Sequence, residues 1–276
     1  MSVTNTLAPL PVGACDCHMH VFDPAYPFAA TATVMPRVSS TLPDYLQLQE
    51  ALGLTRAVVV QSTAYGFDNR CLLDALRVLG DNARGVAMLD ASVDDDTLTR
   101  LHAAGVRGLR FMMLGDPLVP WDALEPLAAR IAPLGWHINL QLDGTEFPRH
   151  LQRLARLAVP LVIDHNGKFL SPPSVAAPEF LALRALMDTG RCWVKLSAPY
   201  ETSRSGAPDY ADVGLLASAL ALAYPQRCLW ASNWPHMGRE TPPSEADLLS
   251  LLRFWAPDEA AVRCILVDNP RQLYGF

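Results

Sequence analysis

The sequence predicts a single (β/α)8 barrel domain over residues 1–276. Three observations support this prediction: eight short apolar runs, amphipathic stretches between them, and a length that suits one such barrel. Strands alternating with helices are typical of a parallel sheet, and a barrel of this kind has about 250 residues. The predicted strands are residues 13–20, 57–62, 85–90, 106–112, 136–142, 160–165, 192–197 and 227–233.

Helical patterns separate these runs, because Leu and Ala recur there at steps of three and four residues. Several of them begin with Asp, Pro or Ser and end at Gly, as helix caps predict. They include residues 68–79, 95–105, 121–135, 148–158 and 178–190. Two extra helices are expected in the C-terminal part, over residues 243–255 and from residue 257, with Asn269 and Pro270 ending the second.

The composition excludes some classes of protein. Half of the residues are hydrophobic and 18% are charged, which is incompatible with an intrinsically disordered chain. The net charge of −6 argues against nucleic-acid binding, and no apolar run is long enough for a membrane helix. The first residues lack the basic and apolar regions of an export signal. We therefore expect a soluble cytoplasmic protein with a small-molecule partner; homo-oligomerisation stays open.

The six cysteines are scattered along the sequence. Neither a zinc-finger spacing nor a Cys-x-x-Cys pair occurs among them. We expect buried, reduced thiols.

Polar residues concentrate at the predicted carboxyl ends of the strands, where barrels of this class carry their active sites. His18 and His20 alternate in the first strand, so both imidazoles should face the same side. Such a pair is typical of a metal site or of a catalytic site lined with polar side chains. His165 at the end of the sixth strand, and Asn233 with His236 after the eighth, favour a functional site over histidines that only hydrogen-bond.

Four segments, DCHMHVFDP, VIDHNGK, LWASNWPH and NPRQLYGF, occur in this order along the chain. With them the sequence resembles the amidohydrolase superfamily, and within it the branch of 2-pyrone-4,6-dicarboxylate lactonases and sugar lactonases. The resemblance covers residues 13–276 and implies a hydrolase that opens a lactone.

The resemblance also implies roles for individual residues. His18, His20 and His165 would line the site, and Arg110 would bind a substrate carboxylate, although pairing of Arg110 with a core carboxylate such as Asp164 stays open. Thr63 and Gln141 would be polar contacts, and Lys168 stands at a position that is also basic in the family. We add His236 as a candidate substrate contact, because it adjoins Asn233.

Asn233 is the most informative difference between this sequence and the family that it resembles, because the family has a water-activating Asp at this position. A carboxylate can accept a proton from water and an amide cannot, and a general base contributes about 10²- to 10⁴-fold. Either an original Asp has been replaced to trap substrate, or Asn is native to a subgroup with another base or another reaction. Both explanations stay open.

The sequence favours a site without a metal or other cofactor. His18, His20 and His165 supply three ligands at most, and Arg110 adds positive charge nearby. In this interpretation the three imidazoles donate hydrogen bonds that polarise the lactone carbonyl. The alternative is Zn or Mn held by the same three histidines.

The substrate is expected to carry few carboxylates. The segment Gly115-Asp116-Pro117 and Glu201 stand where the resemblance implies arginines, so a sugar-acid lactone fits better than a pyrone dicarboxylate. Two other functions stay open: a metal-dependent decarboxylase or hydrolase, and a catalytically impaired protein that binds substrate.

Overall fold

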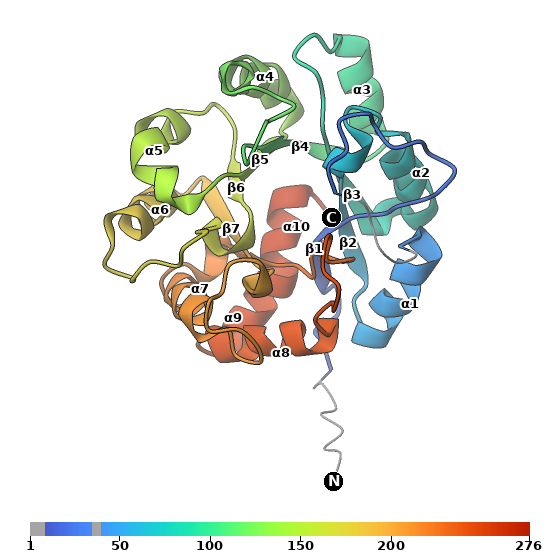
Figure 1. Cartoon of the computed structure of the whole chain (residues 1–276). Coiled ribbons are helices and arrows are strands. Elements are labelled where there is room, and N and C mark those ends of the chain that lie inside the picture. Colours follow the sequence, from blue (N-terminus) through green and yellow to red (C-terminus); the bar gives the residue numbers. More distant parts are fainter. Residues whose placement is uncertain (1–8, 35–39) are drawn as a thin grey trace.

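Eight parallel strands form a barrel with helices around it, as the sequence predicted (Figure 1). The computed structural model describes residues 9–34 and 40–276; residues 1–8 and 35–39, which the single-domain prediction includes, lie outside the described ranges. The strands pair in chain order. They are β1 (Cys15–Met19), β2 (Arg56–Val60), β3 (Ala83–Ala87), β4 (Val106–Met112), β5 (His137–Gln141), β6 (Leu161–Ile163), β7 (Cys192–Leu196) and β8 (Cys228–Trp230).

Several strands end earlier than the apolar runs predicted. Strand β6 stops at Ile163 and β8 stops at Trp230, although their runs extend to residues 165 and 233. The reason is the backbone beyond them, because His165 has a φ of 53° and Asn233 a φ of 60°. A left-handed residue cannot continue a strand, and such conformations are common at functional sites.

Backbone and side-chain hydrogen bonds join β1 to the end of β8. The amide of Asn233 donates to His18 O, and the amide of His20 donates to Trp234 O, both across 2.9 Å. Below them, Asp16 accepts hydrogen bonds from the amide and hydroxyl of Ser232, at 3.0 and 2.5 Å. The barrel is thereby closed where the first and the last strand meet.

The helices are α1 (Leu42–Leu52), α2 (Arg70–Leu79), α3 (Asp95–Ala103), α4 (Leu124–Ile131), α5 (Phe147–Ala155), α6 (Pro178–Asp188), α7 (Ala211–Ala223), α8 (Glu245–Trp255), α9 (Glu259–Arg263) and α10 (Asn269–Tyr274). Helices occur at each of the helical stretches named from the sequence, and two more, α1 and α7, were not among those stretches. Among the described residues, no helix is both long enough and apolar enough to cross a bilayer.

The prediction that Asn269 and Pro270 end a helix was wrong. Helix α9 continues through a π-helical turn, Cys264–Asp268, into α10, and Pro270 lies in the first turn of α10. A proline is tolerated there because the first amides of a helix have no partner within it.

Helix α10 covers the end of the barrel at which the strands begin. Tyr274 is fully buried and packs with residues of the barrel interior such as Cys15 and Val58. Its ring meets the edge of His137 at the start of β5, with centroids 5.2 Å apart. Gly108 makes room for that imidazole, since a Cβ at this position would lie 2.5 Å from the ring. This end is therefore filled, and the functional side chains lie toward the other end.

All six cysteines are free thiols, as expected. Five of them are buried, and Cys264 is partly exposed.

Candidate active site

A cavity of about 350 Å³ opens at the end of the barrel where the strands stop. Seven of the nine predicted site residues line it: His20, Thr63, Arg110, Gln141, His165, Lys168 and Asn233. His18 and His236 do not. Its wall also includes Glu201 and Arg239, which the site prediction did not include.

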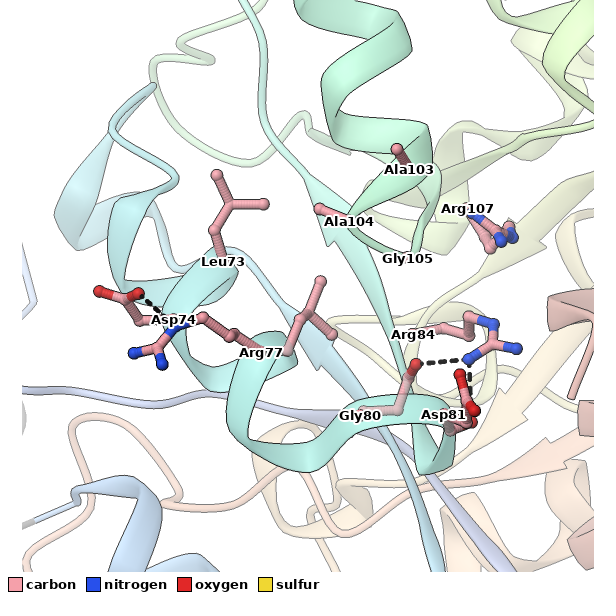
Figure 2. A pocket seen from close by; sticks show the side chains of 12 residues that line it. Leu73, Asp74, Arg77, Gly80, Asp81, Arg84, Ala103, Ala104, Gly105 and Arg107 are labelled. Carbon is pink, nitrogen blue, oxygen red and sulfur yellow. Dashed lines mark hydrogen bonds and ion pairs between the residues drawn. The ribbon is translucent and has the colours of Figure 1, made fainter.

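A second cavity, of about 530 Å³, lies at the opposite edge of the sheet, beside the starts of β3 and β4 (Figure 2). Its charged side chains are engaged with the protein: Arg77 pairs with Asp74, and Arg84 donates to the backbone oxygen of Asp81 (Figure 2). Barrels of this class carry their chemistry at the other end. We therefore place the site in the smaller cavity.

The three predicted histidines converge. The ring centroid of His18 lies 4.8 Å from that of His20 and 5.1 Å from that of His165. Burial lowers the pKa of His20 to about 3, with Arg110 adding to the effect, and burial likewise lowers the pKa values of His18 and His165 well below the ordinary value. All three imidazoles are therefore neutral at pH 7, and each has one N–H.

A buried network lies beneath these rings and is centred on Lys195, which is fully buried in β7. Its Nζ contacts three acceptors: Asn139 Oδ1 at 2.5 Å, His18 Nδ1 at 2.9 Å and Asp164 Oδ1 at 3.1 Å. Asn139 Nδ2 in turn donates to the other oxygen of Asp164 across 2.8 Å. Three acceptors match the three N–H groups of an ammonium.

This network keeps Asp164 ionised. Burial opposes ionisation, but the ammonium of Lys195 holds the pKa of this carboxyl well below its usual range. Burial lowers the pKa of Lys195, and Asp164 counteracts that shift. A buried pair of this kind is stable only when its remaining hydrogen-bonding groups also have partners. Asn139 provides one for each side chain, because it donates to Asp164 and accepts from Lys195.

The hydrogen bonds assign the tautomers of two histidines. His20 Nδ1 lies 2.7 Å from Val60 O, which can only accept, so the N–H of His20 is at Nδ1. His18 Nδ1 lies 2.9 Å from the ammonium of Lys195 and 3.3 Å from Asp164 Oδ1; because the shorter contact is to a group that only donates, we assign the N–H of His18 to Nε2, which lies 3.3 Å from His20 Nε2. Each ring thus uses its N–H within the protein.

The predicted place of His18 on the cavity wall needs correction. Its side chain is fully buried behind His20, and both of its nitrogens contact protein groups. His18 supports His20 rather than facing a ligand. Of the three histidines, His165 has a ring nitrogen, Nε2, without a protein partner among the described residues. Its Nδ1 lies 2.9 Å from Ser197 Oγ, and Nε2 carries the N–H when that hydroxyl donates to Nδ1.

Three of the buried side chains could in principle form a metal site. Possible ligand atoms of His18, Asp164 and His165 lie within 4.8 Å of one another, a set that includes Asp164 in place of the predicted His20. The ammonium of Lys195 already contacts two of these three side chains. Because it occupies His18 Nδ1, His18 Nε2 keeps its proton and cannot be a ligand. This arrangement does not fit a divalent cation.

The side-chain amide of Asn233 is held in one orientation. Its Nδ2 donates to Tyr200 Oη across 2.8 Å and to Glu201 Oε1 across 2.9 Å. A flipped amide would direct its oxygen at the carboxylate of Glu201, so the hydrogen-bond partners select this orientation. Position 233 therefore has surroundings that match an amide.

His236 was predicted to contact substrate, but it does not line the cavity. Its Nδ1 contacts Tyr200 Oη at 2.7 Å and its Nε2 contacts Glu245 Oε1 at 3.1 Å. Because a carboxylate only accepts, His236 donates from Nε2 and accepts from Tyr200 at Nδ1. It acts behind the wall, where it orients Tyr200 and through it Asn233.

Three cationic residues, Arg110, Lys168 and Arg239, line the cavity, and Arg239 donates to the backbone oxygen of Tyr200. Arg110, in β4, donates to Gln61 O at 2.7 Å and to Gln141 Oε1 at 3.5 Å, rather than pairing with Asp164. Lys168 follows β6 and pairs with the carboxylate of Glu201. The guanidinium of Arg110 therefore keeps a net positive charge toward the cavity, whereas Lys168 is neutralised.

The site residues predicted from the sequence do not include Lys195 and Glu201. Lys195 had a usable signal, because a charged residue within an apolar strand needs a buried partner. Glu201 was noted only as the loss of an arginine. Its contact with Asn233 depends on the 3-10 turn Pro199–Glu201, which sequence periodicity does not specify.

The fold and site define a barrel enzyme of the α/β class with its polar centre at the carboxyl ends of the strands. The amidohydrolase family matches residues 15–276, and the chain belongs to that family.

Its relatives include D-galactarolactone isomerase of Agrobacterium fabrum, 36% identical over 96% of this chain and 91% of the relative. The 2-pyrone-4,6-dicarboxylate hydrolase of Comamonas testosteroni is also 36% identical, with the same coverage. A crystal structure of an Agrobacterium tumefaciens protein in its apo form superposes with a TM-score of 0.92 at 34% identity, covering 97% of both chains.

Proposed function

We propose that this protein catalyses acyl transfer at the carbonyl of a small lactone, opening the ring with water. The observation that carries this proposal is the cavity in which His20, His165, Arg110 and Asn233 meet. Its volume of about 350 Å³ suits a small ligand. Both named relatives act on cyclic esters, and the resemblance found in the sequence agrees with them.

The carbonyl is polarised by a neutral donor. His165 offers its Nε2–H to the carbonyl oxygen, and His18 and His20 hold the neighbouring wall in place through their mutual hydrogen bond. A positioned donor of this kind stabilises the oxyanion that forms when a nucleophile adds, and removing one costs about 10²- to 10³-fold in kcat.

The reaction needs no metal in this proposal, since the ammonium of Lys195 stands between His18 and Asp164. Elemental analysis of the purified protein tests the point. We expect less than 0.1 equivalents of Zn or Mn per chain and full activity after dialysis against a chelator. About one equivalent of metal, with activity lost on its removal, would contradict metal independence.

Sugar-acid lactones are the substrate class we favour. Arg110 binds a single carboxylate of the substrate, while the Lys168–Glu201 pair adds little net charge and can contact hydroxyl groups. We also propose a reducing, cytoplasmic location, which suits six free cysteines.

Lactone isomerisation is a second candidate, favoured by one observation. A relative that is 36% identical to this chain, as similar as the hydrolase, is named an isomerase. In that reaction a hydroxyl of the substrate attacks the carbonyl in place of water, so that one lactone becomes another.

A panel of 1,4- and 1,5-lactones of hexaric and hexonic acids, followed by NMR, separates these reactions. Ring opening gives a hydroxy acid and releases a proton, whereas isomerisation gives a second lactone and no acid. A protein that changes none of them but binds one by calorimetry would be a binding protein, and the proposed function would be wrong.

A further inference from the structure

Glu201 is the only carboxylate among the described residues that line the cavity. It lies at the end of the 3-10 turn Pro199–Glu201, directly after β7, and its side chain is 22% exposed. The family's carboxylate was expected at the end of β8, at position 233. The cavity thus keeps one acidic group, but that group comes from the neighbouring strand.

The contacts of Glu201 hold a charged carboxylate at the wall. Oε1 accepts from Asn233 Nδ2 across 2.9 Å, and Oε2 pairs with the ammonium of Lys168. Both contacts favour the ionised form. Each carboxylate oxygen has two lone-pair positions, so one position on each oxygen remains for a ligand or a water molecule.

Other groups on the wall are less suited to accept a proton. His20 Nε2 already receives the N–H of His18, Arg110 has no lone pair to offer, and the amide of Asn233 is not basic. His165 is neutral and is needed as a donor to the carbonyl oxygen.

We propose that Glu201 is the general base of the reaction, taking the place of the carboxylate that β8 does not supply. This inference rests on the proposed function, because it names the group that activates the nucleophile at the same site. Asn233 then has a defined positioning role, because its two N–H groups bind Glu201 and Tyr200 and so fix the base.

The step is balanced for either nucleophile. Glu201 takes the proton from an O–H group of water or of the substrate. The oxygen of that group forms a bond to the lactone carbonyl carbon, and the electron pair of the carbonyl bond moves to the carbonyl oxygen near His165. When that pair returns, the ring C–O bond breaks, and Glu201 gives its proton to the departing ring oxygen. With water the product is the hydroxy acid; with a substrate hydroxyl it is the isomeric lactone.

The test uses Glu201→Gln and Glu201→Ala, with Glu50→Gln as the matched control, because Glu50 is exposed on α1. We expect kcat to fall 10²- to 10⁴-fold in both Glu201 variants and to stay within twofold in the control. Sodium formate is a small carboxylate that fits the space left by the deleted side chain. It should raise the kcat of Glu201→Ala at least tenfold. It should restore nothing in Glu201→Gln or in His165→Ala.

Retention of a third or more of wild-type kcat by Glu201→Gln would overturn the inference, as would the absence of formate rescue in a folded Glu201→Ala. If the unpaired Lys168 prevents folding, Glu201→Ala combined with Lys168→Met removes that charge, and the rescue is measured there. Inactivity of the unaltered protein on every lactone would instead refute the proposed function, and the inference with it.

Discussion

The amide of Asn233 donates to the carboxylate of Glu201 across 2.9 Å, so the end of β8 supports an acidic group that belongs to the end of β7. The same amide donates to Tyr200, whose hydroxyl contacts His236, and His236 in turn contacts Glu245. An aspartate at position 233 would have no N–H for either partner. This contact favours the second explanation of the departure from the family, in which Asn is native to the site.

Asn233→Asp is therefore expected to lower kcat at least tenfold. The new carboxylate would face that of Glu201, and two like charges at hydrogen-bond distance cannot both stay ionised without cost. Steady-state kinetics on the preferred lactone measures the effect, with thermal unfolding to show that the variant is folded. An increase of 100-fold or more would show instead that the site is built for a carboxylate at this position.

Lys195→Met is expected to destabilise the fold by about 3–5 kcal/mol, because it leaves the buried charge of Asp164 without its partner. Urea unfolding followed by circular dichroism measures the loss. The double variant Lys195→Met with Asp164→Asn removes both charges and should recover more than half of the stability. Equal stability of the single and double variants would mean that this charge pair is not what holds the network together.

The sequence allowed the barrel and seven residues of the cavity wall to be predicted, because apolar runs and the approximate ends of strands follow from periodicity. Arg110 and Gln141 could be placed in this way, since they belong to strands whose direction is fixed. The backbone course of the loops after β6 and β8 could not be predicted, because it includes left-handed residues such as His165 and Asn233, although both had been named as site residues.

The sequence also could not predict which side chains face the cavity and which are buried behind its wall. His18 and His20 alternate as predicted and converge with His165, but the hydrogen bond from Lys195 places His18 beneath the wall. That bond joins residues 177 positions apart, and no local pattern specifies it. The same applies to His236, whose contact with Tyr200 removes it from the cavity.

Stability is expected to fall as the pH is lowered from about 6.5 to about 3. Burial lowers the pKa values of His20 and His137 to about 3, while in the unfolded chain they return to the ordinary value near 6.5. Between these values the unfolded state binds more protons than the folded state, so stability rises with pH, by about 1 kcal/mol per pH unit for each group.

Urea unfolding at a series of pH values measures this slope. His137→Leu is the matched variant, since His137 lies at the filled end of the barrel and outside the cavity. In His137→Leu the dependence of stability on pH should be weaker by about 1 kcal/mol per pH unit, the contribution of one proton. An unchanged slope would show that His137 does not contribute to acid sensitivity.

Arg110→Ala is expected to weaken the binding of an acidic lactone at least fivefold, which corresponds to about 1 kcal/mol, the scale of a hydrogen bond to a charged group. The reason is that Arg110 directs its unneutralised charge into the cavity. Calorimetric titration gives the affinity, and a neutral lactone of the same ring size should lose less. Arg107→Ala, in the same strand but beside the opposite cavity, is the control and should bind as the unaltered protein does. Equal affinity of Arg110→Ala and Arg107→Ala for the acidic lactone would remove Arg110 from the substrate site.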